Sequence, residues 1–168
     1  MFENLLKPGK IGKLTVKNRM KYAATVDNYC DYKTCDMTDR EVEFLRERAR
    51  GGFGIVTSQG GHPHILGKGY IGQMGLDSDE FIPGLKRLSA AMKENGAVAI
   101  GQVMHTGRYG HLHEYGVKEV IAGGKKVSGM PVGPSAMKSP IRRYGECREM
   151  TIEEIEESVE LHAQAARR

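Results

Sequence analysis

Apolar and polar positions along the chain alternate in blocks that predict strands and helices in turn. Apolar runs at 19–25, 53–58 and 97–104 predict three strands, and the third is apolar enough to be covered on both faces. Apolar residues at helical spacing between these runs predict two amphipathic helices. The first helix carries Val42, Leu45 and Ala49 and ends at Gly51-Gly52, and the second carries Phe81, Leu85, Leu88 and Met92 and ends at Asn95-Gly96.

Two capping boxes mark the starts of helices. In Thr38-Asp39-Arg40-Glu41 and in Thr151-Ile152-Glu153-Glu154, a hydroxyl and a carboxylate three residues apart are placed to bond each other's backbone N–H groups. The second box follows a long stretch, punctuated by Gly and Pro, that runs from His105 to about Met150. The helix that it opens carries the apolar stripe Ile152, Ile155, Val159 and Ala166.

The resulting order, β-α-β-α-β-loop-α, predicts an α/β fold with a parallel sheet. A barrel and an open doubly wound sheet both fit this order, but no G-x-G-x-x-G follows any strand, which favours the barrel. Three parallel strands alone would leave two unpaired edges, and the last helix needs a fourth strand beside it. We therefore expect a (β/α)8 TIM barrel, of which residues 1–168 form the N-terminal portion, truncated to about the first three βα units.

Composition and charge exclude several classes of protein. The 168 residues carry a net charge of +4, and the basic pairs Lys125-Lys126 and Arg142-Arg143 are too short to predict nucleic-acid binding, so solvated loops are expected there. No apolar stretch approaches the ~18 residues of a membrane helix, and residues 1–10 lack the order of a signal peptide. The three cysteines form no C-x-x-C pair. A reduced, cytoplasmic protein is expected.

The carboxyl ends of the strands are where a barrel places its active site. Small residues around Thr25 would let a flat ring approach the backbone, although small core residues fit the same pattern. Gly60, after the second strand, also permits a close approach. Gln102 lies in an otherwise apolar strand, where we expect a buried carboxamide. It can donate to and accept from a pyrimidine-like ring, or be satisfied within the core.

Histidines and an arginine add further candidates. His105 and Arg108 follow the third strand and flank the same pocket mouth, and His105 fits an acid–base group or a structural donor. The pairs His62/His64 and His111/His113 are reminiscent of metal ligands, but no carboxylate or Cys stands at ligand spacing. We therefore expect no metal site.

In this order and spacing, the motifs resemble the opening of the old yellow enzyme family of NADH:flavin oxidoreductases, and most of all its 2,4-dienoyl-CoA reductase branch. The resemblance covers nearly the whole chain. It rests on Leu5-Leu6-Lys7-Pro8 through Leu14–Arg19, where a short hairpin leads into Asn-Arg, on Arg50–Gly54, on Gln102–Tyr109, and on Gly133–Ala136 with Ser139–Ile141 and Met150-Thr151.

The resemblance implies FMN at the barrel mouth, with NADH or NADPH as reductant. By position, it implies that Ala24, Thr25 and Val26 line the isoalloxazine, that Gly60 contacts its edge and that Gln102 binds its pyrimidine. The implied reaction passes hydride from the nicotinamide through the flavin to a conjugated C=C bond of an enone or enoyl substrate, a small unsaturated carbonyl compound. Substrate contacts are expected at His105, Arg108 and Tyr109.

The chain also departs from the family pattern. Many relatives have Pro and Met in place of Ala24 and Thr25, and Thr or Cys in place of Val26, so the flavin would be tuned differently. The family's substrate-anchoring His or Asn pair, its proton-donating Tyr and its flavin-binding Arg belong to later strands. We expect these residues beyond Arg168 and assign no catalytic residue within the chain. The long branch of the family adds an iron-sulfur cluster and a nucleotide-binding (FAD) domain after the barrel.

Two other interpretations stay open. One is a half-barrel that catalyses nothing and serves as an interaction module. The other is amine oxidation of the trimethylamine dehydrogenase type within the same family. The expected partners are a small-molecule substrate, the remainder of the same polypeptide and further copies in a homo-oligomer.

Overall fold

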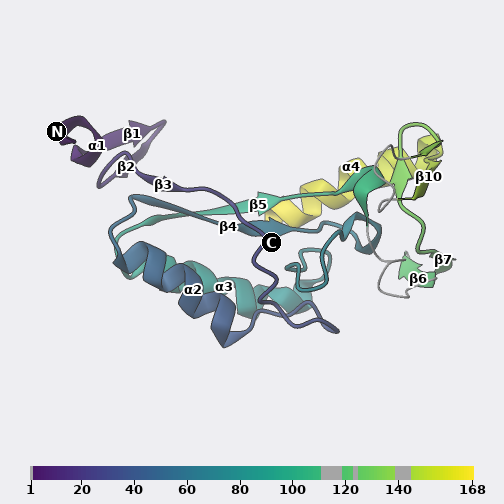
Figure 1. Cartoon of the computed structure of the whole chain (residues 1–168), viewed down its shortest axis with the longest axis horizontal. Helices are drawn as coiled ribbons and strands as arrows, with labels where there is room; N and C mark the ends of the chain where they lie inside the picture. The colour runs from purple at the N-terminus through teal and green to yellow at the C-terminus, as the bar shows by residue number, and fades with distance from the viewer. Residues whose placement is uncertain (1, 111–118, 123–124, 139–144) are drawn as a thin grey trace.

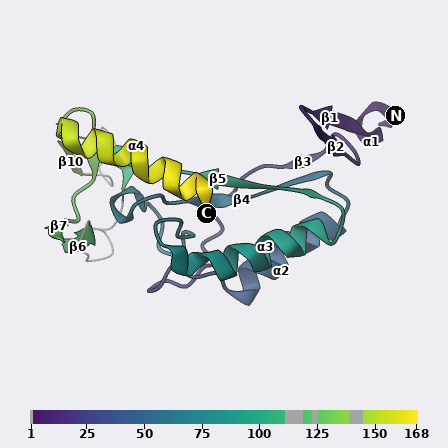
Figure 2. The same ribbon diagram turned by 180° about the vertical axis from the view of Figure 1, so that it is seen from behind.

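The structure is a computed structural model, and it describes residues 2–110, 119–122, 125–138 and 145–168. Its centre is a three-stranded parallel sheet in the order β3-β4-β5, built from β3 (Lys21–Tyr22), β4 (Ile55–Gly61) and β5 (Val98–Val103). Helices α2 (Asp39–Arg50) and α3 (Ile82–Lys93) lie side by side under the sheet, and α4 (Ile152–Arg167) runs along β5 (Figures 1 and 2). The α/β class with a parallel sheet is confirmed.

Smaller elements surround this centre. An antiparallel hairpin precedes the sheet, as the resemblance implies, and a short helix that was not expected comes before the hairpin. Five short strands lie in the long segment after β5, where only irregular chain was expected. These elements are α1 (Glu3–Leu6), β1 (Gly9–Ile11), β2 (Leu14–Val16), β6 (Glu119–Ala122), β7 (Lys125–Ser128), β8 (Val132–Gly133), β9 (Met137–Lys138) and β10 (Glu146–Glu149), with 3-10 turns at Ile65–Gly67, Asp79–Phe81 and Gly107–Tyr109.

The hydrophobic core lies between the sheet and the two helices beneath it. The stripe expected on α2 is buried there, together with Val56 of β4 and Leu88 and Met92 of α3. Tyr22 and Phe53 pack edge to face with ring centroids 5.8 Å apart, which joins β3 to the turn before β4. Each large apolar side chain buried in this way stabilises the fold by roughly 1.5–3 kcal/mol.

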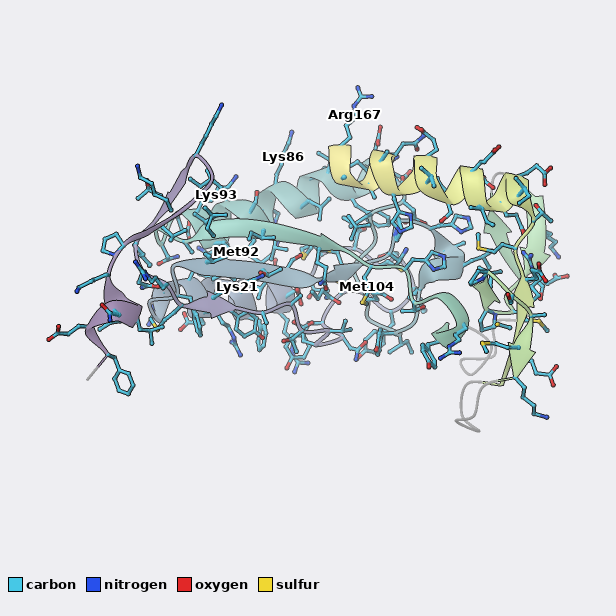
Figure 3. The ribbon with its side chains drawn as sticks, turned by 90° about the horizontal axis from the view of Figure 1, so that it is seen from above. Lys21, Lys86, Met92, Lys93, Met104 and Arg167 are labelled. Atoms are coloured by element: carbon cyan, nitrogen blue, oxygen red, sulfur yellow. The ribbon has the colours of Figure 1, made fainter. Side chains whose placement is uncertain are left out.

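The opposite face of the sheet is open in the described part of the chain. Seen from above, the three strands lie over α2 and α3, with α4 beside β5 and no helix in front (Figure 3). The expectation that the third strand is covered on both faces was wrong for this chain. β5 is an edge strand, and Gly101 and Gln102 are exposed.

The strand boundaries differ from those expected at two places. The regular ladder of β3 covers only two residues instead of 19–25. β4 begins at Ile55 and runs through Gly61, so that Gln59 and Gly60 lie inside the strand and not in the turn after it. The reason is pairing with β5, which continues past an irregularity between Thr57 and Gly60.

The two capping boxes have different outcomes. At α4 the reciprocal box is complete, because Thr151 and Glu154 each accept a hydrogen bond from the other's backbone N–H. At α2 the Thr38 hydroxyl accepts from the Glu41 N–H at 3.3 Å, but the Glu41 carboxyl group does not reach back. It is fully buried instead. The prediction of a box at Thr38 was therefore half wrong.

The apolar stripe expected on α4 is not buried within the described chain. Ile152 and Val159 are each 67% exposed and Ile155 is also exposed, whereas Ala165 is buried. The helix touches β5 through the neighbouring face. Lys125-Lys126 also differ from expectation, since they lie in strand β7, where Lys126 pairs with Glu119. Arg142-Arg143 lie outside the described residues.

Asn18 joins the hairpin to the rest of the fold. Its side-chain amide donates to the Gly52 carbonyl at 2.7 Å, and its carbonyl oxygen accepts from the N–H groups of Met20 at 3.1 Å and Gly54 at 2.9 Å. A Cβ at Gly54 would come within 2.5 Å of the backbone carbonyl oxygen of Asn18 and within 2.6 Å of its side-chain oxygen, so this approach requires glycine. Asn18 therefore sets where β3 and β4 begin relative to one another.

We expect Asn18→Ala to destabilise the protein by about 2–4 kcal/mol, because it leaves buried backbone groups without partners. Urea unfolding followed by circular dichroism measures this change. Asn4→Ala, at an exposed position of α1, is the matched control and should leave the midpoint unchanged. Equal midpoints for both variants would contradict the role given to Asn18.

Candidate functional site

The carboxyl ends of the three parallel strands meet at one edge of the sheet. Gly60 and Gln102 are register partners on β4 and β5. Thr25 follows β3 by three residues, and β3 pairs in parallel with β4. The Gln59 amide of β4 donates to Asp27 at 3.3 Å, which ties the segment after β3 to the same edge. The structure thus brings together the strand ends that carry Thr25, Gly60 and Gln102.

Exposure alternates along the segment after β3. Thr25 is exposed and donates to the Ala23 carbonyl at 3.3 Å, whereas Ala24 and Val26 are half-buried. The Gln102 side chain is exposed, so the expectation of a buried amide was wrong for this chain. In the described residues its carboxamide makes no hydrogen bond, and both of its polar atoms are free to bind a ligand.

Gly60 is buried between two neighbouring side chains. A Cβ there would come within 2.8–2.9 Å of the Met104 side chain, so Met104 occupies the space that glycine leaves. The Gln73 amide donates to the Gly60 carbonyl at 2.9 Å and accepts from the Gly69 N–H at 2.8 Å. The fully buried Gln73 fixes the backbone of β4 at this point, a contact that sequence reasoning missed.

Glu41 and Asp27 form an acidic cluster behind this edge, which sequence reasoning also missed. Glu41 is fully buried on α2, and burial together with Asp27 raises its pKa to about 9. Helical spacing carried the signal, since Glu41 precedes Leu45 and Ala49 by four and eight residues on the buried stripe. Asp27 follows Thr25 by two residues, so the cluster lies next to the segment that carries Thr25.

Histidines gather between the loop after β4, the loop after β5 and helix α4. His105 stacks on His162 of α4 with ring centroids 6.1 Å apart, and its Nδ1 accepts from the Gly107 N–H at 2.9 Å. His62 is fully buried, and its Nδ1 lies 3.6 Å from Asp77. Burial lowers the pKa of His62 to about 3 and that of His105 to about 4, so both are neutral at pH 7.

Arg108 and Tyr109 interact with each other. The Arg108 guanidinium donates to the Tyr109 hydroxyl at 2.6 Å and lies 4.7 Å from its ring centroid. Its other amino group lies 2.8 Å from the Met137 sulfur on β9. The contacts of His105 are those of a structural histidine. Substrate contact by His105, Arg108 and Tyr109 stays a prediction.

The described residues contain no group of three His, Cys, Asp or Glu side chains arranged to hold a metal ion. His111 and His113 lie outside them. Within the same residues, no helix has the length and apolar character needed to cross a membrane.

A parallel sheet that carries ligand-capable groups at its carboxyl edge is typical of a (β/α)-barrel enzyme. Residues 4–168 match the model of the NADH:flavin oxidoreductase / NADH oxidase family. The chain belongs to this family, whose members use FMN with NADH or NADPH. The resemblance to old yellow enzymes is thereby confirmed.

Curated relatives agree with this assignment. The chain is 36% identical to a metal reductase of Desulforamulus reducens and 31% identical to an NADH oxidase of Thermoanaerobacter brockii. Both alignments cover 98% of this chain. It covers 22% and 24% of those two proteins. The chain therefore spans about a quarter of their length.

Solved structures support the barrel. A 2-naphthoyl-CoA reductase in complex with 2-naphthoyl-CoA is 66% identical over 99% of this chain and 25% of its own, with a TM-score of 0.95. The old yellow enzyme homologue from Zymomonas mobilis is 22% identical over 98% of this chain and 44% of its own, with a TM-score of 0.82. The fold is that of the first part of the old yellow enzyme TIM barrel.

The depressed pKa values of the histidines predict acid sensitivity. In the unfolded chain His105 takes up a proton near its ordinary pKa of 6.5, whereas the folded protein does so only near pH 4. Stability from this group is therefore lost as the pH falls from about 6.5 towards 4. When the pH falls from 7 to 5, we expect the free energy of unfolding of His105→Asn to decrease by roughly 1–2 kcal/mol less than that of the parent.

Urea unfolding at the two pH values measures this difference. Each protein serves as its own reference at pH 7, so a general loss of stability in the variant cancels. An identical acid-induced loss in parent and variant would contradict the assignment to His105.

Proposed function

We propose that the protein is an FMN-dependent oxidoreductase of the ene-reductase type, and that this chain supplies one edge of its flavin site. The observation that carries the proposal is the meeting of three strand ends, with Thr25, Gly60 and Gln102, on a sheet whose adjoining face is open. Family membership supports FMN as the group that this edge receives.

The residues present suit an isoalloxazine ring. The free carboxamide of Gln102 offers a donor and an acceptor, which match the alternating polar edge of a pyrimidine. Gly60 is buried against Met104, so it contributes its backbone position on β4 and not open space, and Thr25 adds an exposed hydroxyl. Ala24 and Val26, half-buried, would contribute through their backbone. When bound, FMN supplies the hydride chemistry, and these residues bind and orient it.

The reductant in this proposal is NADH or NADPH, and the hydride acceptor is a conjugated C=C bond beside a carbonyl group. The similarity to a 2-naphthoyl-CoA reductase favours a coenzyme A thioester of an unsaturated or aromatic acid over a simple enone. An iron-sulfur cluster and FAD would belong to other parts of the protein. Cytoplasmic location and homo-oligomer formation are further parts of the proposal.

The test is anaerobic turnover by the protein as its gene encodes it. We expect the purified protein to carry FMN, to be bleached by NADH or NADPH, and to be reoxidised by 2-naphthoyl-CoA or by an enoyl-CoA. Bleaching by trimethylamine or dimethylglycine in place of a nicotinamide would instead support amine oxidation. The identity of 26% to an N,N-dimethylglycine/sarcosine dehydrogenase of Chromohalobacter salexigens favours including these amines. Absence of flavin would support the module that catalyses nothing.

Gln102→Leu tests the flavin edge. We expect it to weaken FMN binding by roughly 1–3 kcal/mol, because the hydrogen bonds of the amide to the ring are lost. Fluorescence titration of the apoprotein with FMN measures the dissociation constant. Gln164→Leu, on α4, is the matched control. Equal affinity in both variants would remove Gln102 from the site.

A further inference from the structure

Glu41 is a carboxyl group buried without a counterion. It is 0% exposed on α2, and neither of its oxygens accepts a hydrogen bond. Oδ2 of Asp27 is likewise buried without a donor. Since a carboxylate can only accept, two ionised carboxylates facing each other leave both groups unpartnered. Such an arrangement costs several kcal/mol in general.

Asp27 is held on its other side by two donors. Its Oδ1 accepts from the Tyr29 N–H at 3.1 Å and from the Gln59 amide at 3.3 Å. Gln59, itself buried, accepts from the Met74 N–H at 3.4 Å through its own carbonyl. The orientation of Gln59 is thus fixed, and Oδ2 of Asp27 is left without a donor beside the carboxyl group of Glu41, on which Asp27 acts.

The groups that act on Glu41 are few. Burial raises the pKa of Glu41 most, the neighbouring carboxyl group of Asp27 raises it further, and the Gln59 amide lowers it. The thiol of Cys30 also lies in this cluster, and burial raises its pKa, so the thiol adds no charge beside Glu41. No cation of the described chain is among the groups that shift Glu41. One proton between the two carboxyl groups turns the unpartnered pair into a donor and an acceptor.

We propose that Glu41 is a positioning residue for the flavin-facing segment 23–26: its carboxyl group keeps a proton at neutral pH and donates a hydrogen bond to Asp27. The inference rests on the proposed flavin site. Asp27 directly follows Val26, so bonds from α2 and β4 to Asp27 fix the end of the segment that carries Thr25. Glu41 itself contacts no ligand and acts through Asp27.

The sign of the pH dependence follows from the raised pKa. In the unfolded chain Glu41 ionises near 4.5, and in the folded protein it ionises near 9. Its contribution to stability is therefore fully present below about pH 4.5 and is lost as the pH rises to about 9. Above that pH the hydrogen bond becomes a repulsion between two carboxylates, and segment 23–26 loses its support.

Two substitutions of Glu41 distinguish the effect of its hydrogen bond to Asp27 from the effect of its ionisation. Glu41→Gln keeps the shape and a donor for Asp27 but cannot ionise, whereas Glu41→Met fills similar space and donates nothing. Glu47→Gln, on the exposed side of the same helix, is the control. All variants are made in the protein as its gene encodes it.

Infrared spectroscopy at pH 7 tests the proton directly. We expect the spectrum of the parent minus that of Glu41→Gln to contain the C=O stretch of a protonated carboxyl group. The same difference with Glu47→Gln should lack that band. A carboxylate band in its place for Glu41 would overturn the proposal.

FMN titration of the apoproteins tests the positioning role. Relative to the parent at pH 7, we expect Glu41→Gln to bind equally well and Glu41→Met to bind about ten-fold more weakly, as a lost buried hydrogen bond implies. As the pH rises past 9, affinity of the parent should fall relative to Glu41→Gln. Equal affinities for the parent and Glu41→Met at pH 7 would overturn the positioning role.

The two tests also separate this inference from the proposed function. If the parent binds no FMN, the proposed function fails and the role towards the flavin fails with it, while the carboxyl band still decides whether Glu41 holds the proton. If the parent binds FMN and all variants behave alike, only the inference about Glu41 fails.

Discussion

The parallel pairing of β4 with β5 is the constraint on which the rest of the structure depends. Backbone hydrogen bonds set Ile55 beside Val98 at one end of the ladder, and near the other end they set Gly60 beside Gln102. Because parallel strands end at the same edge, this register determines which side chains can share a ligand. The irregularity between Thr57 and Gly60 is part of that register, since it shifts the last residues of β4 relative to β5.

Packing below the sheet and polar contacts at its edge serve different purposes. The apolar stripes of α2 and α3 pack against one face of the sheet and stabilise it, but they contribute no polar group to its carboxyl edge. Buried amides and acids hold the edge in place. The Gln73 amide donates a hydrogen bond to the Gly60 carbonyl, and the Gln59 amide donates one to Asp27. Buried polar groups of this kind cost stability unless each finds a partner. Their concentration behind one edge fixes the backbone beside the proposed flavin site.

Periodicity predicted the helices well because their buried stripes are local patterns of 3.6 residues. α2 and α3 begin and end close to the expected residues, and Gly60 and Gln102 were placed on adjacent strand ends. The end of β4 and the exposure of Gln102 depend on neighbouring strands, which no local pattern encodes. The burial of Glu41 was missed for another reason. Its place in a capping box suggested a local partner, whereas tertiary contact with Asp27 decided its orientation.

Chemical-shift mapping of the apoprotein on addition of FMN tests most directly whether the three strand ends form one flavin edge. We expect the resonances of the backbone amides of Thr25 and Gly60 and of the side-chain amide of Gln102 to shift together at the same FMN concentration, while that of the backbone amide of Lys126 on β7 stays unchanged. Shifts confined to one strand end, or centred away from all three, would contradict this expectation.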